Sequence, residues 1–287
     1  MHVGFTSMNN PDEPRPDVLA RELEARGFES LWLGEHSHIP ASRRTPYPAG
    51  GEMPRRYRSM MDPFLSLLLA AEATERLVVG TGVALPLEHD VFDLAKTVAT
   101  IDRLTDGRFH FGVGVGWNEE ELADHRPSVP WSKRYGALAD CVGALKALWT
   151  QADAEYHGRW YDFDAVWCEP KPLQQPHPPI VCGTGGRVGT QHAIAWADAW
   201  MPMDVALGDV GRKVTKFRAI AAEAGRDPAT IAVNLVVFGD PTVDALVAYR
   251  DLGIDRVILG SGRTGWDDPS TILPFVDACA ALIPEVC

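Results

Sequence analysis

A glutamate and a histidine follow a short apolar stretch near the start of the chain, where they could move protons. The sequence SLWLG, residues 30–34, is followed directly by Glu35 and His36. Histidine is the side chain whose ordinary pKa lies nearest to neutral pH, so His36 suits proton transfer beside a redox centre. Glu35 could orient the imidazole. The alternative is that His36 is a hydrogen-bonded histidine in a rim loop.

The same stretch offers two possible metal ligands, because His36 and His38 are separated by one residue. A metal centre would need further ligands from other strands. His110 lies within a predicted strand, and His177 and His192 do not follow strand ends. The sequence therefore predicts no metal site, and a metal hydrolase built on His36 and His38 stays a minor alternative.

Glycines alternate with bulky residues in the sequence TDGRFHFGVGVGWNEEEL, residues 105–122. In the predicted strand 109–115, side chains alternate between faces, so Gly112, Gly114 and Gly116 share one bare face. Such a face permits close approach to the backbone, which favours a flat ligand at the mouth of the strand. The alternative is that neighbouring side chains need the space. Trp117 and Asn118 follow the strand and would border the same ligand.

A glycine-rich run stands between a predicted strand, 179–182, and a predicted helix, 188–197. It consists of Gly183, Thr184, Gly185 and Gly186. Free backbone N–H groups and the helix dipole at such a place favour a phosphate group. Arg187 adds positive charge. The alternative is a tight turn without a ligand.

A long segment of about residues 35–61 is rich in Pro, Gly and Arg and lacks clear periodicity. Loops of that length in compact domains are usually functional. Its basic side chains suggest an anionic ligand or substrate, and the alternative is a solvated loop. These side chains are Arg43, Arg44, Arg55, Arg56 and Arg58.

Strand and helix patterns alternate about eight times along the chain, which predicts parallel strands joined by right-handed crossovers. At 287 residues, this pattern fits a single (β/α)8 TIM barrel over residues 1–287 better than a doubly wound open sheet. A small hairpin is expected at about residues 155–163. In a barrel, the chemistry lies at the C-terminal ends of the strands. The expected strands are 2–6, 30–34, 77–83, 109–115, 179–182, 199–201, 231–238 and 256–259.

The composition restricts the class of protein. The chain has 27 Lys and Arg residues against 39 Asp and Glu residues, which gives a formal charge of −12. An acidic protein is not expected to bind nucleic acid or an anionic membrane surface. No apolar run approaches the ~20 residues that span a bilayer, and no signal-like start is present, so we expect a cytosolic, cytoplasmic protein. Five scattered cysteines without a CxxC pair predict reduced, mostly buried thiols.

Two long runs resemble the luciferase-like monooxygenase superfamily, and most closely its branch of deazaflavin (coenzyme F420)-dependent oxidoreductases of actinobacteria. They are DPFLSLLLAAEATERLVVGTGVALP, residues 62–86, and AKTVATIDRLTDGRFHFGVGVGWNEEEL, residues 95–122. Further stretches fit the same family. They are LWLGEH at 31–36, EYHGRWYDF at 155–163, PKPLQQPHPPIVCGTGG at 170–186 and ADAWMP at 197–202.

The resemblance implies a (β/α)8 barrel that usually forms a homodimer. It implies that Glu35 and His36 lie near the reactive C5 of the deazaflavin. It further implies a non-proline cis peptide at Gly82-Val83, which forms a bulge behind the ring. The phosphate site maps to residues 183–186, and the basic loop would suit an anionic tail.

The sequence departs from the family pattern at three places. Gly116 and Trp117 stand where F420-dependent sugar-phosphate dehydrogenases carry an acidic glutamate, so sugar-phosphate oxidation is not inferred. The run Glu88-His89-Asp90 replaces a frequent Arg-Asn-Pro, and Asp140-Cys141 replaces a frequent Asp-Glu. Trp117 indicates a different and more apolar substrate.

Taken with the resemblance, the sequence predicts an enzyme that transfers hydride between F420 and a small organic substrate while His36 donates or accepts a proton. The close alternative is an FMN-dependent monooxygenase that uses reduced flavin. A non-catalytic flavin or deazaflavin carrier is the alternative from a different class. The expected cofactor-binding residues are Gly82, Val83, Gly114, Gly116, Trp117, Asn118, Gly183, Thr184, Gly185 and Gly186.

Overall fold

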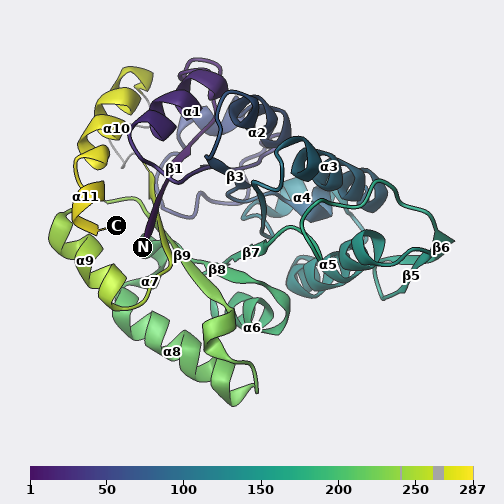
Figure 1. Ribbon diagram of the computed structural model, residues 1–287. Helices are drawn as coiled ribbons and strands as arrows, with labels where there is room; N and C mark the ends of the chain where they lie inside the picture. The colour runs from purple at the N-terminus through teal and green to yellow at the C-terminus, as the bar shows by residue number, and fades with distance from the viewer. Residues whose placement is uncertain (240, 261–267, 287) are drawn as a thin grey trace.

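Eight parallel strands close into a barrel in the computed structural model, which describes residues 1–239, 241–260 and 268–286 (Figure 1). Neighbours around the barrel follow the order β1-β10-β9-β8-β7-β4-β3-β2, and β1 pairs with both β10 and β2. The predicted TIM barrel is therefore confirmed. The strands are β1 (His2–Ser7), β2 (Ser30–Leu33), β3 (Val78–Thr81), β4 (Phe109–Val113), β7 (Ile180–Gly183), β8 (Ala199–Met201), β9 (Ala232–Val237) and β10 (Arg256–Gly260).

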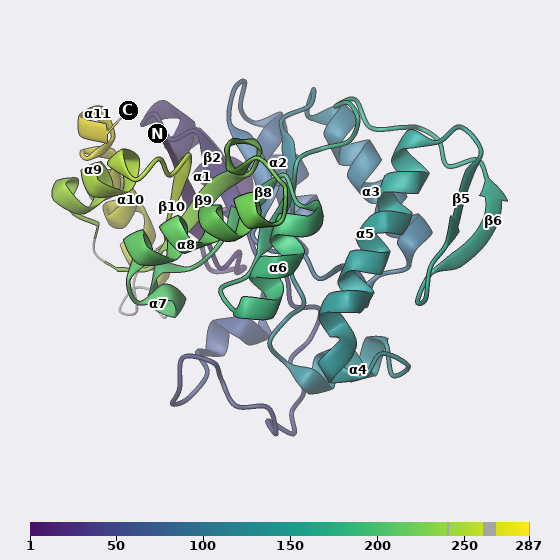
Figure 2. The same ribbon diagram turned by 90° about the horizontal axis from the view of Figure 1, so that it is seen from below.

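Helices cover the outside of the barrel (Figures 1 and 2). Several begin where an aspartate side chain accepts hydrogen bonds from free N–H groups of the first turn, as Asp62 does from Leu65 at 2.9 Å. The longer helices are α1 (Pro16–Ala25), α2 (Pro63–Glu72), α3 (Val91–Leu104), α5 (Arg134–Thr150), α6 (Arg187–Trp196), α8 (Val210–Glu223), α9 (Val243–Asp251) and α10 (Ile272–Ala280). Shorter ones are α4 (Glu119–His125), α7 (Asp204–Leu207) and α11 (Ile283–Val286).

The strands separate two apolar layers. The larger layer lies between strands and helices and contains side chains such as Phe5, Phe109 and Phe111. The smaller layer lies inside the barrel. It consists of Trp32, Val181, Ala199, Met201, Val236 and Ile258.

Trp32 packs inside the barrel because Gly80 on β3 leaves room for its ring. A Cβ atom on Gly80 would lie 2.6 Å from the indole ring. The indole N–H donates to Ser30 Oγ at 2.9 Å, and the guanidinium of Arg256 lies 5.4 Å from the ring. Arg256 in turn makes two hydrogen bonds to Glu29, at 2.6 and 2.8 Å. Arg256 begins β10 and Glu29 directly precedes β2, so this ion pair lies at the end of the barrel opposite to the mouth.

The predicted hairpin is present as an antiparallel pair, β5 (Ala154–His157) and β6 (Asp162–Val166), which projects away from the barrel (Figures 1 and 2). The carboxylate of Asp140 on α5 anchors it, by accepting from Tyr156 Oη at 2.9 Å and from the backbone N–H of Trp160 at 2.5 Å. Asp140, which keeps the aspartate of the family pattern beside the departure at Cys141, thus fixes the hairpin to α5.

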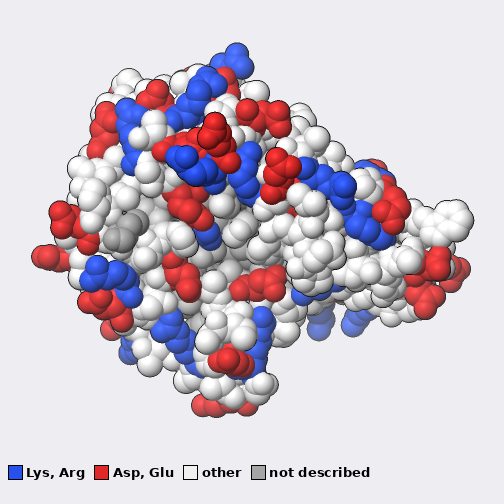
Figure 3. Space-filling view, viewed as in Figure 1, with Lys and Arg blue, Asp and Glu red and all other residues white. Residues whose placement is uncertain are grey.

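The surface carries charges of both signs. On the face seen in Figure 3, acidic and basic side chains are interspersed and no large area has a single sign. Among the described residues, no helix has both the length and the apolar character needed to cross a membrane. The four cysteines that the structure describes are buried, as predicted, and Cys287 lies outside the described residues.

Candidate active site at the mouth of the barrel

The chain that leaves β3 forms a bulge at the barrel mouth. The peptide bond between Gly82 and Val83 is cis, which confirms that prediction. Val83 is held between two glycines, because an added Cβ atom on Gly114 or on Gly183 would lie 2.6 or 2.4 Å from a methyl group of Val83. The bulge therefore fits only because the chain carries glycine directly after β4, at Gly114, and at the end of β7, at Gly183.

This packing corrects the expectation that a ligand lies directly against the glycine face of β4. An added Cβ on Gly112 would lie 1.8 Å from the carbonyl oxygen of Thr81, and Gly116 faces Leu85 with φ of +67°. The space beside Gly112, Gly114 and Gly116 is taken by the end of β3 and the bulge. A ligand at the mouth would contact Val83, and the glycines make room for Val83.

Glu35 holds the same bulge. Its carboxylate accepts from the backbone N–H of Leu85 at 2.7 Å and pairs with His89 Nε2 at 2.8 Å. Its own N–H donates to the carbonyl of Val83 at 3.1 Å. Burial alone would lower the pKa of His89, but the hydrogen bond to Glu35 and its negative charge raise it overall. Glu35 therefore does not orient His36, in contrast to the expectation from their adjacency.

A different glutamate, Glu121 on α4, orients His36. Its Oε2 lies 2.7 Å from Nδ1 of His36, and the two side chains are 1% and 7% exposed. On the other side of the ring, the indole N–H of Trp117 donates to Nε2 at 3.0 Å. Both ring nitrogens of His36 are therefore engaged.

These two contacts define the tautomer of His36. An indole N–H only donates, so Nε2 carries no proton and accepts. A neutral imidazole must then carry its proton on Nδ1, which donates to Glu121. Nε2 is therefore the atom whose lone pair could take a proton from a bound substrate.

Aromatic rings from the long loop and from the segment after β4 cover His36. The ring centroids of Tyr57 and Trp117 lie 5.5 and 5.6 Å from that of His36, in edge-to-face arrangements. Tyr47 packs against both Tyr57 and Trp117, at 5.4 and 5.8 Å. Burial, together with the adjacent Tyr47, raises the pKa of Tyr57, so its hydroxyl stays neutral. The histidine thus lies in a largely apolar enclosure.

Helix α4 fixes both the loop and the histidine through consecutive residues. Asn118 caps the helix, and its Oδ1 accepts from the N–H groups of Glu120 and Glu121 at 3.1 and 3.3 Å. Glu120 binds the loop, since its Oε1 accepts from Ser42 Oγ at 2.7 Å and from the N–H of Arg44 at 3.0 Å. Figure 2 shows the loop and α4 at the same end of the molecule. Asn118 therefore positions other residues and does not itself face the cavity.

Some arginines of the loop contact other residues of the protein, and others are exposed on the surface. Arg56 is buried and pairs with Glu13 at 2.9 Å, and Arg44 pairs with Glu120 at 3.2 Å. The guanidinium of Arg43 lies 5.9 Å from the ring of Trp117. The remaining two, Arg55 and Arg58, are exposed.

A cavity of about 150 Å³ opens at the C-terminal ends of the strands. Its floor combines the bulge with apolar side chains of the barrel interior and the start of the glycine-rich run. It is lined by Thr6, Trp32, Gly82, Val83, Gly183, Thr184, Gly185, Met201, Met203, Val236, Phe238 and Ile258. Of the predicted cofactor residues, five line this cavity, whereas Gly114, Gly116, Trp117, Asn118 and Gly186 do not.

Gly186 instead begins helix α6 beside the cavity. It occupies the N-cap position without a side-chain hydrogen bond, and an added Cβ there would meet nothing within 4 Å. The first N–H groups of α6 therefore remain available to an anion. Thr184 lies between the cavity and α5, with its Oγ1 3.4 Å from Tyr135 Oη.

The two histidines of the HxH pair do not converge. His38 contacts Ser37 Oγ through Nδ1 at 2.9 Å and Asp124 through Nε2 at 3.1 Å, while His36 is turned to Glu121. His110 lies inside the barrel, where burial lowers its pKa to about 4. No group of three potential ligands that could hold a metal ion occurs within the described part of the chain.

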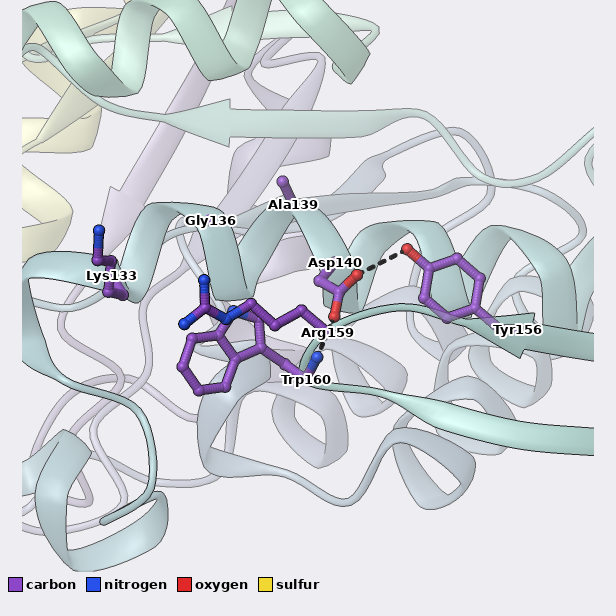
Figure 4. A pocket seen from close by; sticks show the side chains of 7 residues that line it. All are labelled: Lys133, Gly136, Ala139, Asp140, Tyr156, Arg159 and Trp160. Atoms are coloured by element: carbon purple, nitrogen blue, oxygen red, sulfur yellow. Dashed lines mark hydrogen bonds between the residues drawn. The ribbon is translucent and has the colours of Figure 1, made fainter.

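A second hollow of about 380 Å³ lies on the outside, between α5 and the hairpin (Figure 4). Lys133, Asp140, Tyr156, Arg159 and Trp160 are among its lining residues. The carboxylate of Asp140 is already engaged by Tyr156 and Trp160, as Figure 4 shows. This hollow is open and lies outside the barrel, so the barrel mouth is the better candidate.

Residues 17–272 match the family model described as "Luciferase-like monooxygenase". The chain belongs to the luciferase-like monooxygenase family. An uncharacterized protein of Mycobacterium tuberculosis (strain ATCC 25618 / H37Rv) is 37% identical to it over 98% of both chains. The FMNH2-dependent dimethylsulfone monooxygenase of Pseudomonas putida is 34% identical over 171 residues, which cover 59% of this chain and 47% of that protein.

Solved structures of other proteins share the fold. The F420-dependent secondary alcohol dehydrogenase in complex with an F420-acetone adduct superposes with a TM-score of 0.73, at 18% identity, over 100% of this chain and 99% of that one. The luciferase-like barrel is thus confirmed. Its relatives and structural neighbours include proteins named for F420 and proteins named for FMN.

The barrel mouth of this luciferase-like protein fits part of a tricyclic ring system with a phosphate. The apolar floor around Val83 suits a flat ring, and the free helix start at Gly186 suits an anion. The cavity of about 150 Å³ is smaller than the roughly 300–1,000 Å³ of most ligand pockets. Only the inner part of such a ligand would be enclosed in this arrangement.

Sequence reasoning missed Glu121, the residue that orients His36. The sequence contains a signal for it: Asn118 is a good N-cap, and position 121 then lies next to the buried Leu122 on the inner side of the helix. Two further missed residues are Glu88 and His89, whose partners come from distant segments. In this luciferase-like protein, an acid therefore lies beside His36 even though Trp117 occupies the end of β4.

Proposed function

We propose that this protein is an oxidoreductase that transfers hydride between F420 and a small organic substrate, with His36 as the proton donor or acceptor. The observation that carries the proposal is the buried His36, whose Nε2 lone pair points away from Glu121 and is kept as an acceptor. When bound, F420 would supply a carbon that accepts or releases hydride. His36 would take or return the accompanying proton at Nε2.

The cofactor assignment rests on the mouth of the barrel. Val83 and Trp32 provide an apolar floor, and Gly183, Thr184 and Gly185 lead from it to the start of α6. Val83 and Trp32 would hold the edge of the ring, and the glycine-rich run would hold a phosphate group. The exposed Arg55 and Arg58 would attract an anionic tail.

A direct test is a side-by-side binding titration with F420 and FMN, followed by ring fluorescence. F420 is expected to bind more tightly than FMN. Turnover is then measured with a panel of small alcohols and ketones, using the wild type and His36→Asn. Loss of the general acid or base should lower kcat about 100-fold or more. Unchanged turnover in His36→Asn would exclude this role for the histidine.

The second candidate is an FMN-dependent monooxygenase. The relative from Pseudomonas putida, which is 34% identical over 171 residues, is named for FMNH2. Preferential binding of FMN in the titration, together with oxygen-dependent turnover, would favour this reading. Tight binding of either cofactor without turnover would favour a non-catalytic carrier.

Many members of barrel families act as oligomers, and we propose a homodimer here. Leu65 and Leu69 lie one helical turn apart on α2 and are 72% and 40% exposed. Exposed leucines at this spacing form an apolar strip that a second copy could cover. Light scattering of the purified protein measures the mass directly, and a mass of 31.4 kDa would contradict the dimer.

A further inference from the structure

Polar side chains connect the surroundings of His36 to the surface of the protein. The hydroxyl of Ser37 lies 2.7 Å from His125 Nε2 and 2.9 Å from His38 Nδ1. His38 then contacts Asp124, which is 63% exposed. This part of the network is therefore open to solvent.

Glu88 lies between this surface network and the centre of the site. Its Oε2 is 3.7 Å from His125 Nε2, and its side chain is only 5% exposed. Burial, followed by the charges of Glu121 and Glu35, raises the pKa of Glu88 to about 9, while a hydrogen bond with Ser37 opposes that rise. Glu88 therefore carries a proton at neutral pH.

Two buried oxygen atoms in this region have no hydrogen-bond partner within the described part of the chain. They are Oε1 of Glu121 and Oε2 of Glu88. Leaving a buried polar atom unpaired is unfavourable, so such atoms call for an explanation. A carboxyl pair that passes a proton would use both of these oxygens.

We propose that His36 exchanges protons with solvent through a relay that runs from Glu121 to Glu88 and past Ser37 to His38. This inference rests on the proposed role of His36 as the group that handles the substrate proton. During substrate oxidation, Nε2 accepts one proton, Nδ1 gives one to Glu121, and one proton leaves at His38. A turn of the imidazole restores the starting tautomer, and no electrons move along the relay.

The relay would give the proton on His36 a route to solvent, which the enclosure of the side chain otherwise blocks. The rings of Tyr47, Tyr57 and Trp117 cover the histidine and keep its side chain 7% exposed. A ligand in the mouth would exclude water further. Without an internal path, the proton taken up by His36 could leave only through the substrate side.

The test measures proton exchange in the ligand-free protein, so that it does not depend on knowing the cofactor. Histidine is labelled with ¹⁵N, and NMR determines which ring nitrogen of His36 carries the proton and how fast that proton exchanges with water. The wild type should show a proton on Nδ1. Glu88→Gln keeps the size and neutrality of the buried acid but cannot relay a proton, so exchange should slow about 10-fold or more.

A matched control is Glu119→Gln, which changes an exposed glutamate on α4, the helix that carries Glu121, and should leave the exchange rate unchanged. Ser37→Ala breaks the relay at its exposed end. It removes the hydrogen bond that Ser37 makes with Glu88 but leaves both buried carboxyl groups in place, so it should slow exchange even where Glu88→Gln folds poorly. An exchange rate in Ser37→Ala and Glu88→Gln equal to that of the wild type would overturn the relay. So would equal slowing in Glu119→Gln.

A second readout separates the relay from the proposed function. In a turnover assay, the Glu88→Gln variant should respond to added imidazole buffer, which can carry the proton instead, whereas the wild type should not. Slow exchange by NMR without any turnover would leave the relay supported and the proposed function contradicted. Turnover by the wild type, together with unchanged exchange and no buffer response in Glu88→Gln, would support the proposed function and contradict the relay.

Discussion

The carboxylate of Glu121 lies 2.7 Å from Nδ1 of His36, and the two residues are separated by 85 positions in the chain. Their meeting depends on β2 and β4 ending at the same side of the barrel, two strands apart. The contact fixes the ring and its tautomer, while Trp117 reaches the opposite nitrogen. Most chemical expectations for this protein follow from this arrangement.

The first expectation concerns Glu121 itself. Glu121→Gln replaces an acceptor-only carboxylate by an amide that can donate to Nδ1, which favours the wrong tautomer of His36. In comparable acid–histidine pairs such a change lowers kcat by up to about 10⁴-fold, and we expect at least about 100-fold here. Steady-state kinetics measures the loss, and the dissociation constant of the cofactor should stay unchanged. Glu119→Gln is the matched control, and a similar loss in that variant would contradict the assignment.

Trp117 is expected to compete with the substrate for His36. Its N–H occupies the acceptor lone pair of Nε2 at 3.0 Å. Trp117→Phe keeps the aromatic packing but removes the N–H, so a hydroxyl-bearing substrate no longer displaces a hydrogen bond. One hydrogen bond contributes about 1 kcal/mol, which predicts a KM lower by about fivefold. A higher KM together with an unchanged kcat would show that the indole N–H serves the substrate instead.

Glu88 is expected to make the protein less stable as the pH rises. The pKa of its carboxyl is raised from 4.5 to about 9, chiefly by burial and then by Glu121 and Glu35. Between these two values the folded state keeps a proton that the unfolded state has lost, so the free energy of unfolding falls with pH. The contribution is at most about 1.4 kcal/mol per pH unit. Urea unfolding between pH 5 and 9 should show a smaller slope for Glu88→Gln than for the wild type.

The close packing of Val83 against Gly183 leads to a prediction about stability that does not depend on the reaction. Gly183→Ala would place a Cβ atom 2.4 Å from a Val83 methyl group and should destabilise the fold by about 1–3 kcal/mol. Gly186→Ala is the control for stability, because nothing lies within 4 Å of an added Cβ there.

The double variant Gly183→Ala/Val83→Ala should recover much of the loss, since the shortened side chain vacates the contested space. Thermal unfolding is measured for the wild type, Gly183→Ala, Val83→Ala and the double variant, which together form a double-mutant cycle. Strictly additive losses would mean that the two residues do not share this space.

Local patterns in the sequence determined the barrel. Each of the eight strands was predicted close to its observed position, because apolar runs, helix caps and terminating glycines are local signals that neighbouring residues create together. The strand Ala199–Met201 agrees to the residue. The cis peptide at Gly82-Val83 came from the family resemblance instead.

The partners of the polar side chains were decided only by the tertiary structure. Glu35 precedes His36 directly, yet adjacent residues at the end of a strand point in different directions, so Glu35 reaches Leu85 and His89 while His36 reaches Glu121. The glycine face of β4 was recognised from alternation, but what fills it depends on the path of β3. Sequence alone thus determined which elements form and which end of the barrel carries chemistry. The closure of the barrel determined which side chains meet there, because it brings together residues whose separation along the chain carries no signal of contact.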